Sequence, residues 1–200
     1  MGSEGHSWIV ILAAENGPGS AASTIAAISR ACAMVPPERV CLVVVGGSQE
    51  EPPAVPGGVT FINIIVQPGD RGTANGMLLA TLVVTERDPQ ARLLFMSSGR
   101  HFPTLASVPD EPVVFAATGS QLYRAFRQRV PEVVSSMDAA LFGRNSNRSG
   151  ATALQALYEN LPAMDFSNDV LPGREHVVRI VRGSACDWCR TSAREFHFLH

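Results

Sequence analysis

Two turns in the sequence carry residue types that could bind a phosphate group. The first turn, residues 14–20, contains two glycines, and glycine lets backbone N–H groups approach a phosphate near the N-terminus of a following helix. Turns between strands and helices also contain Gly and Pro for purely local reasons, so that alternative stays open. The second turn, within residues 66–76, is more specific, because it packs Gln67, Arg71 and Thr73 between a predicted strand and a predicted helix.

The C-terminal part of the chain offers a different chemistry, that of a zinc site. It contains four residues of types that bind zinc: Cys186, Cys189, His197 and His200. The interval between the cysteines and the first histidine is shorter than in a zinc finger, so structural zinc is kept as an alternative. Thioredoxin-type redox chemistry is less favoured, because that cysteine pair opens a helix near the start of its fold.

The basic residues exclude several mechanisms. All 16 are arginine, so a P-loop lysine, a lysine Schiff base and a lysine general base are ruled out. A formal net charge of −2 gives no basic field that would collect nucleic acid or an anionic membrane surface. Neither is expected as a partner.

The apolar runs and the cysteine content bear on the compartment. The longest apolar runs, 8–14 and 40–45, are far shorter than the roughly 20 residues that cross a bilayer, so no transmembrane helix is expected. No basic region precedes the first run, which argues against a secretory signal. Four cysteines do not make a disulfide scaffold, so we expect a cytoplasmic protein.

Strands and helices alternate along the first half of the chain. Apolar runs rich in β-branched residues predict strands at 8–13, 40–45, 61–66 and 93–96, and helical spacing predicts helices at 21–34 and 73–87. This β-α-β-β-α-β order predicts a Rossmann-like three-layer α/β sandwich with a mostly parallel sheet. Ligands bind such sheets beyond the carboxyl ends of the strands, here the loops that start at Ala14, Gln67 and Ser97.

The second half adds two strands and several helices to a single predicted domain, 1–200. We expect a nucleotide-binding half, 1–108, and a reduced second half with the C-terminal segment, 109–200. The expected elements of the second half are a strand at 113–117, a helix capped by Ser120 that runs to 129, a helix from Pro131, a linker at 143–150, helices at 151–160 and 166–171, and a strand at 177–181.

The turn after the third strand resembles a known motif. Bacterial mannose-1-phosphate guanylyltransferases carry the stretch Glu/Gln-Pro-x-x-Arg-Asn/Gly-Thr-Ala-Pro, in a loop that helps to hold the nucleotide. Asn75 stands where the family has the final Pro. The first strand and the segment 184–188, which is similar to the family's Trp-Ser-Asp-Trp-Gly, occur along the chain in the same order as in the family. The matching residues are Gln67, Pro68, Arg71, Gly72, Thr73 and Ala74.

The resemblance implies a reaction and a set of site residues. In the family, a sugar 1-phosphate oxygen attacks the α-phosphate of GTP, which releases pyrophosphate and leaves GDP-mannose. By resemblance, Ala13, Ala14, Gly17 and the matching turn would bind the nucleotide, Asp165 and Ser167 would lie near the sugar phosphate, and Asp187 would bind Mg²⁺. Helix capping is the alternative for Asp165 and Ser167, and a surface loop is the alternative for Asp187.

Several parts of the family pattern are missing. Residues 18–20 are Pro-Gly-Ser where the family has Thr-Arg-Leu, and 97–101 lack the metal-binding aspartate. A segment of several dozen residues is absent between His101 and Val113, which predicts a truncated sugar-binding half and exposed apolar surface that favours homo-oligomers. Two hypotheses follow: a mannose-1-phosphate guanylyltransferase-type enzyme of weak or no activity, or a non-catalytic nucleotide-binding or regulatory relative.

Overall fold

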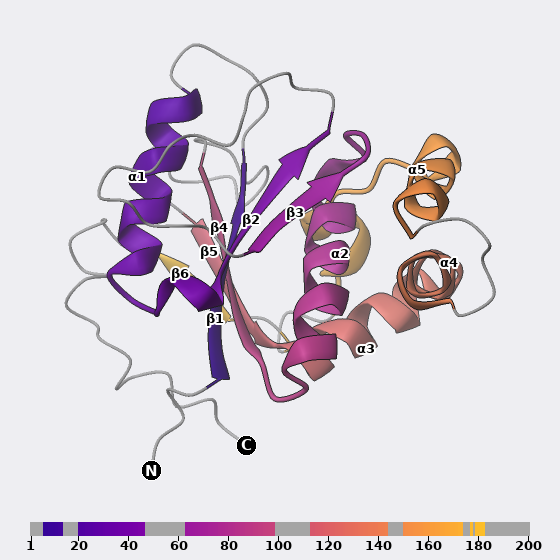
Figure 1. Ribbon diagram of the computed structural model, residues 1–200. Coiled ribbons are helices and arrows are strands. Elements are labelled where there is room, and N and C mark those ends of the chain that lie inside the picture. The colour runs from indigo at the N-terminus through magenta and orange to yellow at the C-terminus, as the bar shows by residue number, and fades with distance from the viewer. Residues whose placement is uncertain are drawn as a thin grey trace.

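One six-stranded sheet organises the protein. The computed structural model describes residues 6–13, 20–46, 63–98, 113–143, 150–173, 177 and 179–182. The strands lie in the order β3-β2-β1-β4-β5-β6 (Figure 1). Their bounds are β1 Ser7–Leu12, β2 Val40–Val45, β3 Asn63–Gln67, β4 Arg92–Ser97, β5 Val113–Thr118 and β6 Arg179–Arg182. The helices are α1 Ser20–Cys32, η2 Pro37–Arg39, α2 Gly72–Arg87, α3 Gly119–Arg129, α4 Pro131–Phe142, α5 Gly150–Asn160 and η3 Phe166–Val170.

The first four strands are parallel and the last two are antiparallel. β1 pairs in parallel with β2 and β4, and β2 pairs in parallel with β3. β5 runs antiparallel to both β4 and β6. The mostly parallel α/β sheet expected from the sequence is therefore confirmed. The directions of β5 and β6 depend on the path by which the chain returns to the sheet. An apolar run predicts a strand but not its direction.

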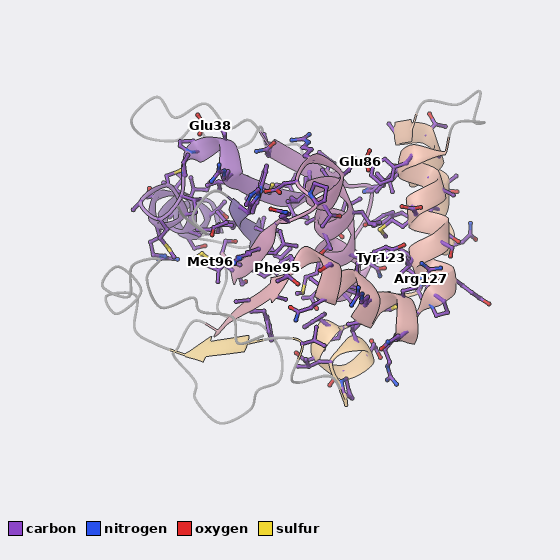
Figure 2. The ribbon with its side chains drawn as sticks, turned by 90° about the horizontal axis from the view of Figure 1, so that it is seen from below. Glu38, Glu86, Phe95, Met96, Tyr123 and Arg127 are labelled. Carbon is purple, nitrogen blue, oxygen red and sulfur yellow. The ribbon has the colours of Figure 1, made fainter. Side chains whose placement is uncertain are left out.

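Helices cover both faces of the sheet and make a three-layer structure. α1 lies on one face, whereas α2 and α3 lie on the other, with α4 and α5 outside them (Figure 1). Side chains alternate along each strand, so neighbouring residues enter different cores. On β4, Phe95 belongs to the core beneath α2 and Met96 to the core beneath α1 (Figure 2). Because both faces of the sheet are buried, these strands are continuous apolar runs.

Three local details differ from the sequence prediction. β3 extends to Gln67, which was expected in the loop. The cap of α3 is Thr118 and not Ser120, because the Thr118 hydroxyl accepts from the Gln121 backbone N–H and the Gln121 side chain completes a capping box. The short helix expected at 166–171 is the π-helix η3, closed by a hydrogen bond from the Leu171 N–H to the Phe166 carbonyl at 2.9 Å.

A polar cluster ties the start of β1 to the end of α2. The Trp8 indole N–H donates to Oδ2 of Asp88 at 2.9 Å, and His6 Nδ1 lies 2.8 Å from Oδ1 of the same carboxylate. Partial burial raises the pKa of Asp88, but the hydrogen bonds from Trp8, His6 and the Gln90 backbone outweigh it and hold the pKa below its usual value. The carboxylate is therefore stabilised in its charged form.

Replacing Asp88 by alanine is expected to lower the free energy of unfolding by about 1–3 kcal/mol at neutral pH, since the buried Trp8 N–H loses its acceptor. The pKa of Asp88 is lower in the folded than in the unfolded state. The stabilisation that Asp88 provides is therefore complete above the pKa of the unfolded state, which is ~4. It is lost as the pH falls through the lower pKa of the folded state. Urea denaturation at neutral pH and at about pH 2 measures both effects, with the exposed Asp138→Ala as control. Equal losses for the two variants would contradict this assignment.

Candidate functional site

The carboxyl ends of the four parallel strands meet at one edge of the sheet. The chain crosses from β1 to β2 and β3 on one side, and then returns through α2 to β4 on the other side of β1. The point where the strand order reverses, between β1 and β4, is where sheets of this kind bind ligands. At the end of β1, the Ala13 N–H donates to the Val43 carbonyl of β2 at 2.9 Å, and on the β4 side the Ser98 N–H donates to the Leu12 carbonyl at 3.0 Å. Ala13, a predicted nucleotide-binding residue, thus borders the expected crevice.

The turn between β3 and α2 pairs its backbone with a distant segment. The Met164 N–H donates to the Arg71 carbonyl at 3.0 Å, and the Ala74 N–H donates to the Met164 carbonyl at 3.1 Å. Gly72 lies between them with a φ of 81°, a left-handed conformation that favours glycine. A Cβ at this position would be 2.3 Å from the Met164 carbonyl oxygen. The geometry therefore requires glycine here.

The Arg71 side chain contacts the end of α5. Its Nε donates to the Tyr158 carbonyl at 2.8 Å and its Nη2 donates to the Glu159 carbonyl at 3.1 Å. The last carbonyls of a helix lack partners within the helix and carry partial negative charge, so a guanidinium there is stabilising. In this structure Arg71 caps a helix C-terminus.

Thr73 connects the two predicted halves of the site. Its hydroxyl donates to Oδ2 of Asp165 at 3.1 Å and accepts from the Phe166 backbone N–H at 3.1 Å. Oδ1 of Asp165 accepts from the Asn168 N–H at 3.0 Å, so Asp165 also caps η3. Half-buried Ser167 follows on η3. Sequence reasoning placed Thr73 and Asp165 in separate subsites, and the structure brings them into contact.

Gln67 and Pro68 lead into this turn. Gln67 is buried, and the Tyr158 hydroxyl donates to its Oε1 at 3.4 Å. Burial raises the pKa of Tyr158, which keeps its phenol protonated as a donor. Gly76 makes room for Gln67, since a Cβ there would lie 2.9 Å from Nε2. Pro68 is half-buried beside Gly46.

Sequence reasoning missed Asn75. It is fully buried, and its Nδ2 donates to the Arg71 carbonyl at 2.6 Å and to the Pro162 carbonyl at 2.9 Å. The sequence did contain a signal, because Asn75 stands where the family motif has proline. Proline has no side-chain donor that could make these contacts. Buried Tyr158 was also missed, and the sequence gives no sign of its role.

The N-terminus of α2 has partners from the protein itself. The Gly72 N–H donates to Oδ1 of Asp70 at 2.9 Å, and the Ala74 N–H donates to Met164. These are among the helix donors that a phosphate would otherwise use. The α2 end of the turn is therefore built mainly from internal contacts.

Other expected site residues lie outside the described residues: Ala14, Gly17, Asp187 and the zinc candidates Cys186, Cys189, His197 and His200. In the described part of the chain, no group of three or more His, Cys, Asp or Glu side chains could hold a metal ion. Within the same part, no helix has the length and apolar character needed to cross a membrane.

Comparison with known proteins supports the fold. No protein-family model matches the sequence, and no curated protein matches it. The structure is similar to the crystal structure of mannose-1-phosphate geranyltransferase from Thermus thermophilus, with a TM-score of 0.58 and 17% sequence identity. The match covers 82% of this chain and 70% of that chain. The protein thus has a Rossmann-like α/β fold with a mostly parallel sheet, as the sequence predicted. That its sugar-binding half is shortened stays a prediction.

Proposed function

We propose that the protein is a nucleotidyltransferase that joins a nucleoside triphosphate to a sugar 1-phosphate. The observation that carries the proposal is the reversal of strand order between β1 and β4, at the carboxyl edge of a parallel sheet. The structural neighbour is a mannose-1-phosphate geranyltransferase by name, which supports a sugar 1-phosphate as one substrate. The motif at 67–74 favours GTP as the other, which makes GDP-mannose the proposed product.

The proposed reaction is transfer at the α-phosphorus of GTP. An oxygen of the sugar 1-phosphate forms a bond to that phosphorus, the bond to the bridging oxygen of the β-phosphate breaks, and pyrophosphate leaves with the electron pair. Such transfer depends on positioning and on neutralising charge. Ala13, Ala14, Gly17 and the backbone of the 67–74 turn would hold the nucleotide, while Asp165 and Ser167 would border the sugar phosphate.

Mg²⁺ is proposed as the cofactor through Asp187 alone. Asp187 lies outside the described residues, and those residues contain no group of three or more His, Cys, Asp or Glu side chains that could hold a metal ion. A magnesium ion can bind through one or two carboxylates together with substrate phosphates, and bound to phosphate oxygens it would neutralise their charge.

A non-catalytic, nucleotide-binding protein is the second candidate. The contacts of Arg71 and Thr73 favour it, because both side chains bind groups of the protein that a nucleotide would have to displace. Nucleotide binding would then occur at the β1 and β4 ends, and pyrophosphate would not be released.

A pyrophosphate-release assay with GTP, mannose 1-phosphate and Mg²⁺ tests the proposal. We expect activity in the natural protein and a loss of about a hundredfold or more in Asp187→Asn, because metal sites are this sensitive even to changes around the ligands. Asp138→Asn, on the exposed side of α4, is the control and should keep full activity. GTP binding without turnover would favour the second candidate. Failure to bind any nucleoside triphosphate would overturn both.

A further inference from the structure

The turn that the sequence assigns to the nucleotide is bonded along its length to one segment of the second half. Residues 67–76 and 158–166 are more than eighty positions apart in the sequence, and we call their contacts the clasp. Backbone pairing with Met164 lies at its centre. Arg71 contacts one end of the segment at Tyr158 and Glu159, and Thr73 contacts the other end at Asp165.

We propose that Arg71, Thr73 and Asn75 are positioning residues, which hold the 158–166 segment so that Ser167 can contact the phosphate of the sugar substrate. In this role their side chains bind the protein and not the nucleotide. The role of Ser167 rests on the proposed function, whereas the clasp itself does not.

Two donors of Arg71, the Thr73 hydroxyl and the Asn75 amide are directed into the protein. Nε and Nη2 of Arg71 both point to carbonyls at the C-terminus of α5, where a cation is favoured by the helix dipole. The Arg71 carbonyl in turn accepts from Met164 and from Asn75. Moving Arg71 toward a phosphate would break contacts at both ends of the residue.

Thr73 and Asp165 fix each other. A threonine hydroxyl has one donor, which Thr73 directs to Asp165, and its oxygen accepts from Phe166. The second oxygen of Asp165 accepts from Asn168. With both carboxylate oxygens bonded to the protein, Asp165 orients the start of η3 and does not itself reach a ligand.

Among the described residues of the clasp and η3, Ser167 is the hydroxyl that we assign to a ligand. It is half-buried on η3, two residues after Asp165, and no hydrogen bond joins its side chain to the described part of the protein. η3 is a π-helix, a rare form that occurs often at functional sites. The clasp sets where this turn, and with it Ser167, lies relative to the first half.

Amide hydrogen exchange tests the clasp without any ligand. In Thr73→Val, which keeps the side-chain shape, we expect the Phe166 amide to exchange about tenfold faster or more, because its acceptor is lost. Thr73→Ser, which retains the hydroxyl, should restore the protection. If the valine variant does not fold, Arg71→Gln should speed exchange at Met164 and Phe166, with Arg127→Gln, at an exposed position of α3, as the matched control. Unchanged exchange in the variants would overturn the clasp.

Separate titrations with mannose 1-phosphate and GTP test the positioning role. Thr73→Val and Ser167→Ala should each weaken mannose 1-phosphate binding by about tenfold, while GTP affinity changes less than about twofold. Only Thr73→Val should alter the exchange of Phe166, and Thr73→Ser should recover the sugar affinity. Loss of GTP affinity in Thr73→Val with unchanged sugar affinity would overturn the positioning role. If the natural protein binds neither ligand while exchange responds as expected, the proposed function and the role of Ser167 fail, and the clasp alone stands.

Discussion

Replacing Gly72 by alanine is expected to lower the free energy of unfolding by about 3–5 kcal/mol, with a fall in Tm of roughly 10 °C. Two effects add at this position. An alanine at a φ of 81° is strained by about 1–2 kcal/mol, and its Cβ would also lie 2.3 Å from the Met164 carbonyl oxygen. That oxygen belongs to backbone held on both sides by the turn, so it cannot move without breaking the pairing. Thermal unfolding followed by circular dichroism measures the loss.

Two other glycines separate these effects. Gly173 has a φ of 73°, and a Cβ placed there would have nothing within 4 Å, so Gly173→Ala should cost only the strain of about 1–2 kcal/mol. Gly69, in the same turn as Gly72, has open space and no left-handed φ, so Gly69→Ala should change stability by less than about 0.5 kcal/mol. Equal losses for Gly72→Ala and Gly173→Ala would show that the contact with Met164 is not tight.

Replacing Phe166 by alanine is expected to cost about 3–5 kcal/mol, because a large ring leaves a cavity in a packed core. The side chain is 1% exposed. Its ring lies 5.4 Å from that of Phe115 on β5, edge to face, and 5.8 Å from that of Phe126 on α3. The three rings join η3 to the sheet and to α3, next to the residues of the clasp. Chemical denaturation gives the free energy directly.

The exposed Phe142 on α4 is the matched control for Phe166. It is 39% exposed, so Phe142→Ala should cost less than about 1 kcal/mol. Phe166→Leu, which fills most of the volume, should recover the greater part of the stability. A loss in Phe166→Ala as small as that in Phe142→Ala would mean that η3 is not docked on the core as described.

These packing contacts bear on how the two halves of a ligand site would be held together. Phe166 anchors η3 through its side chain, and its backbone N–H donates to Thr73 at the start of α2. The same short segment therefore belongs both to the hydrophobic core and to the proposed site. A change that loosens this core should weaken binding of a sugar phosphate before it affects a nucleotide at the β1 end.

The strands and helices of the first half follow from the sequence by itself. Runs such as 40–45 are apolar on both faces, and glycine- or proline-containing turns separate them from helical spacing at 21–34 and 73–87. Periodicity and turn chemistry are local, so a sequence displays them directly. The same local patterns predicted that the candidate ligand-binding turns follow the carboxyl ends of the strands. In the structure, Ala13, Gln67 and Ser98 lie at these ends.

Only the tertiary structure decided what the polar residues of the turn contact. Arg71 meets Tyr158 and Thr73 meets Asp165, at separations of 87 and 92 residues. An arginine or threonine in a turn is compatible with a phosphate, a carbonyl or a carboxylate, since all are acceptors of similar geometry. The choice among them depends on which segment folds against the turn. That choice is made by the packing of α5 and η3 on the sheet, which no local pattern in the sequence records.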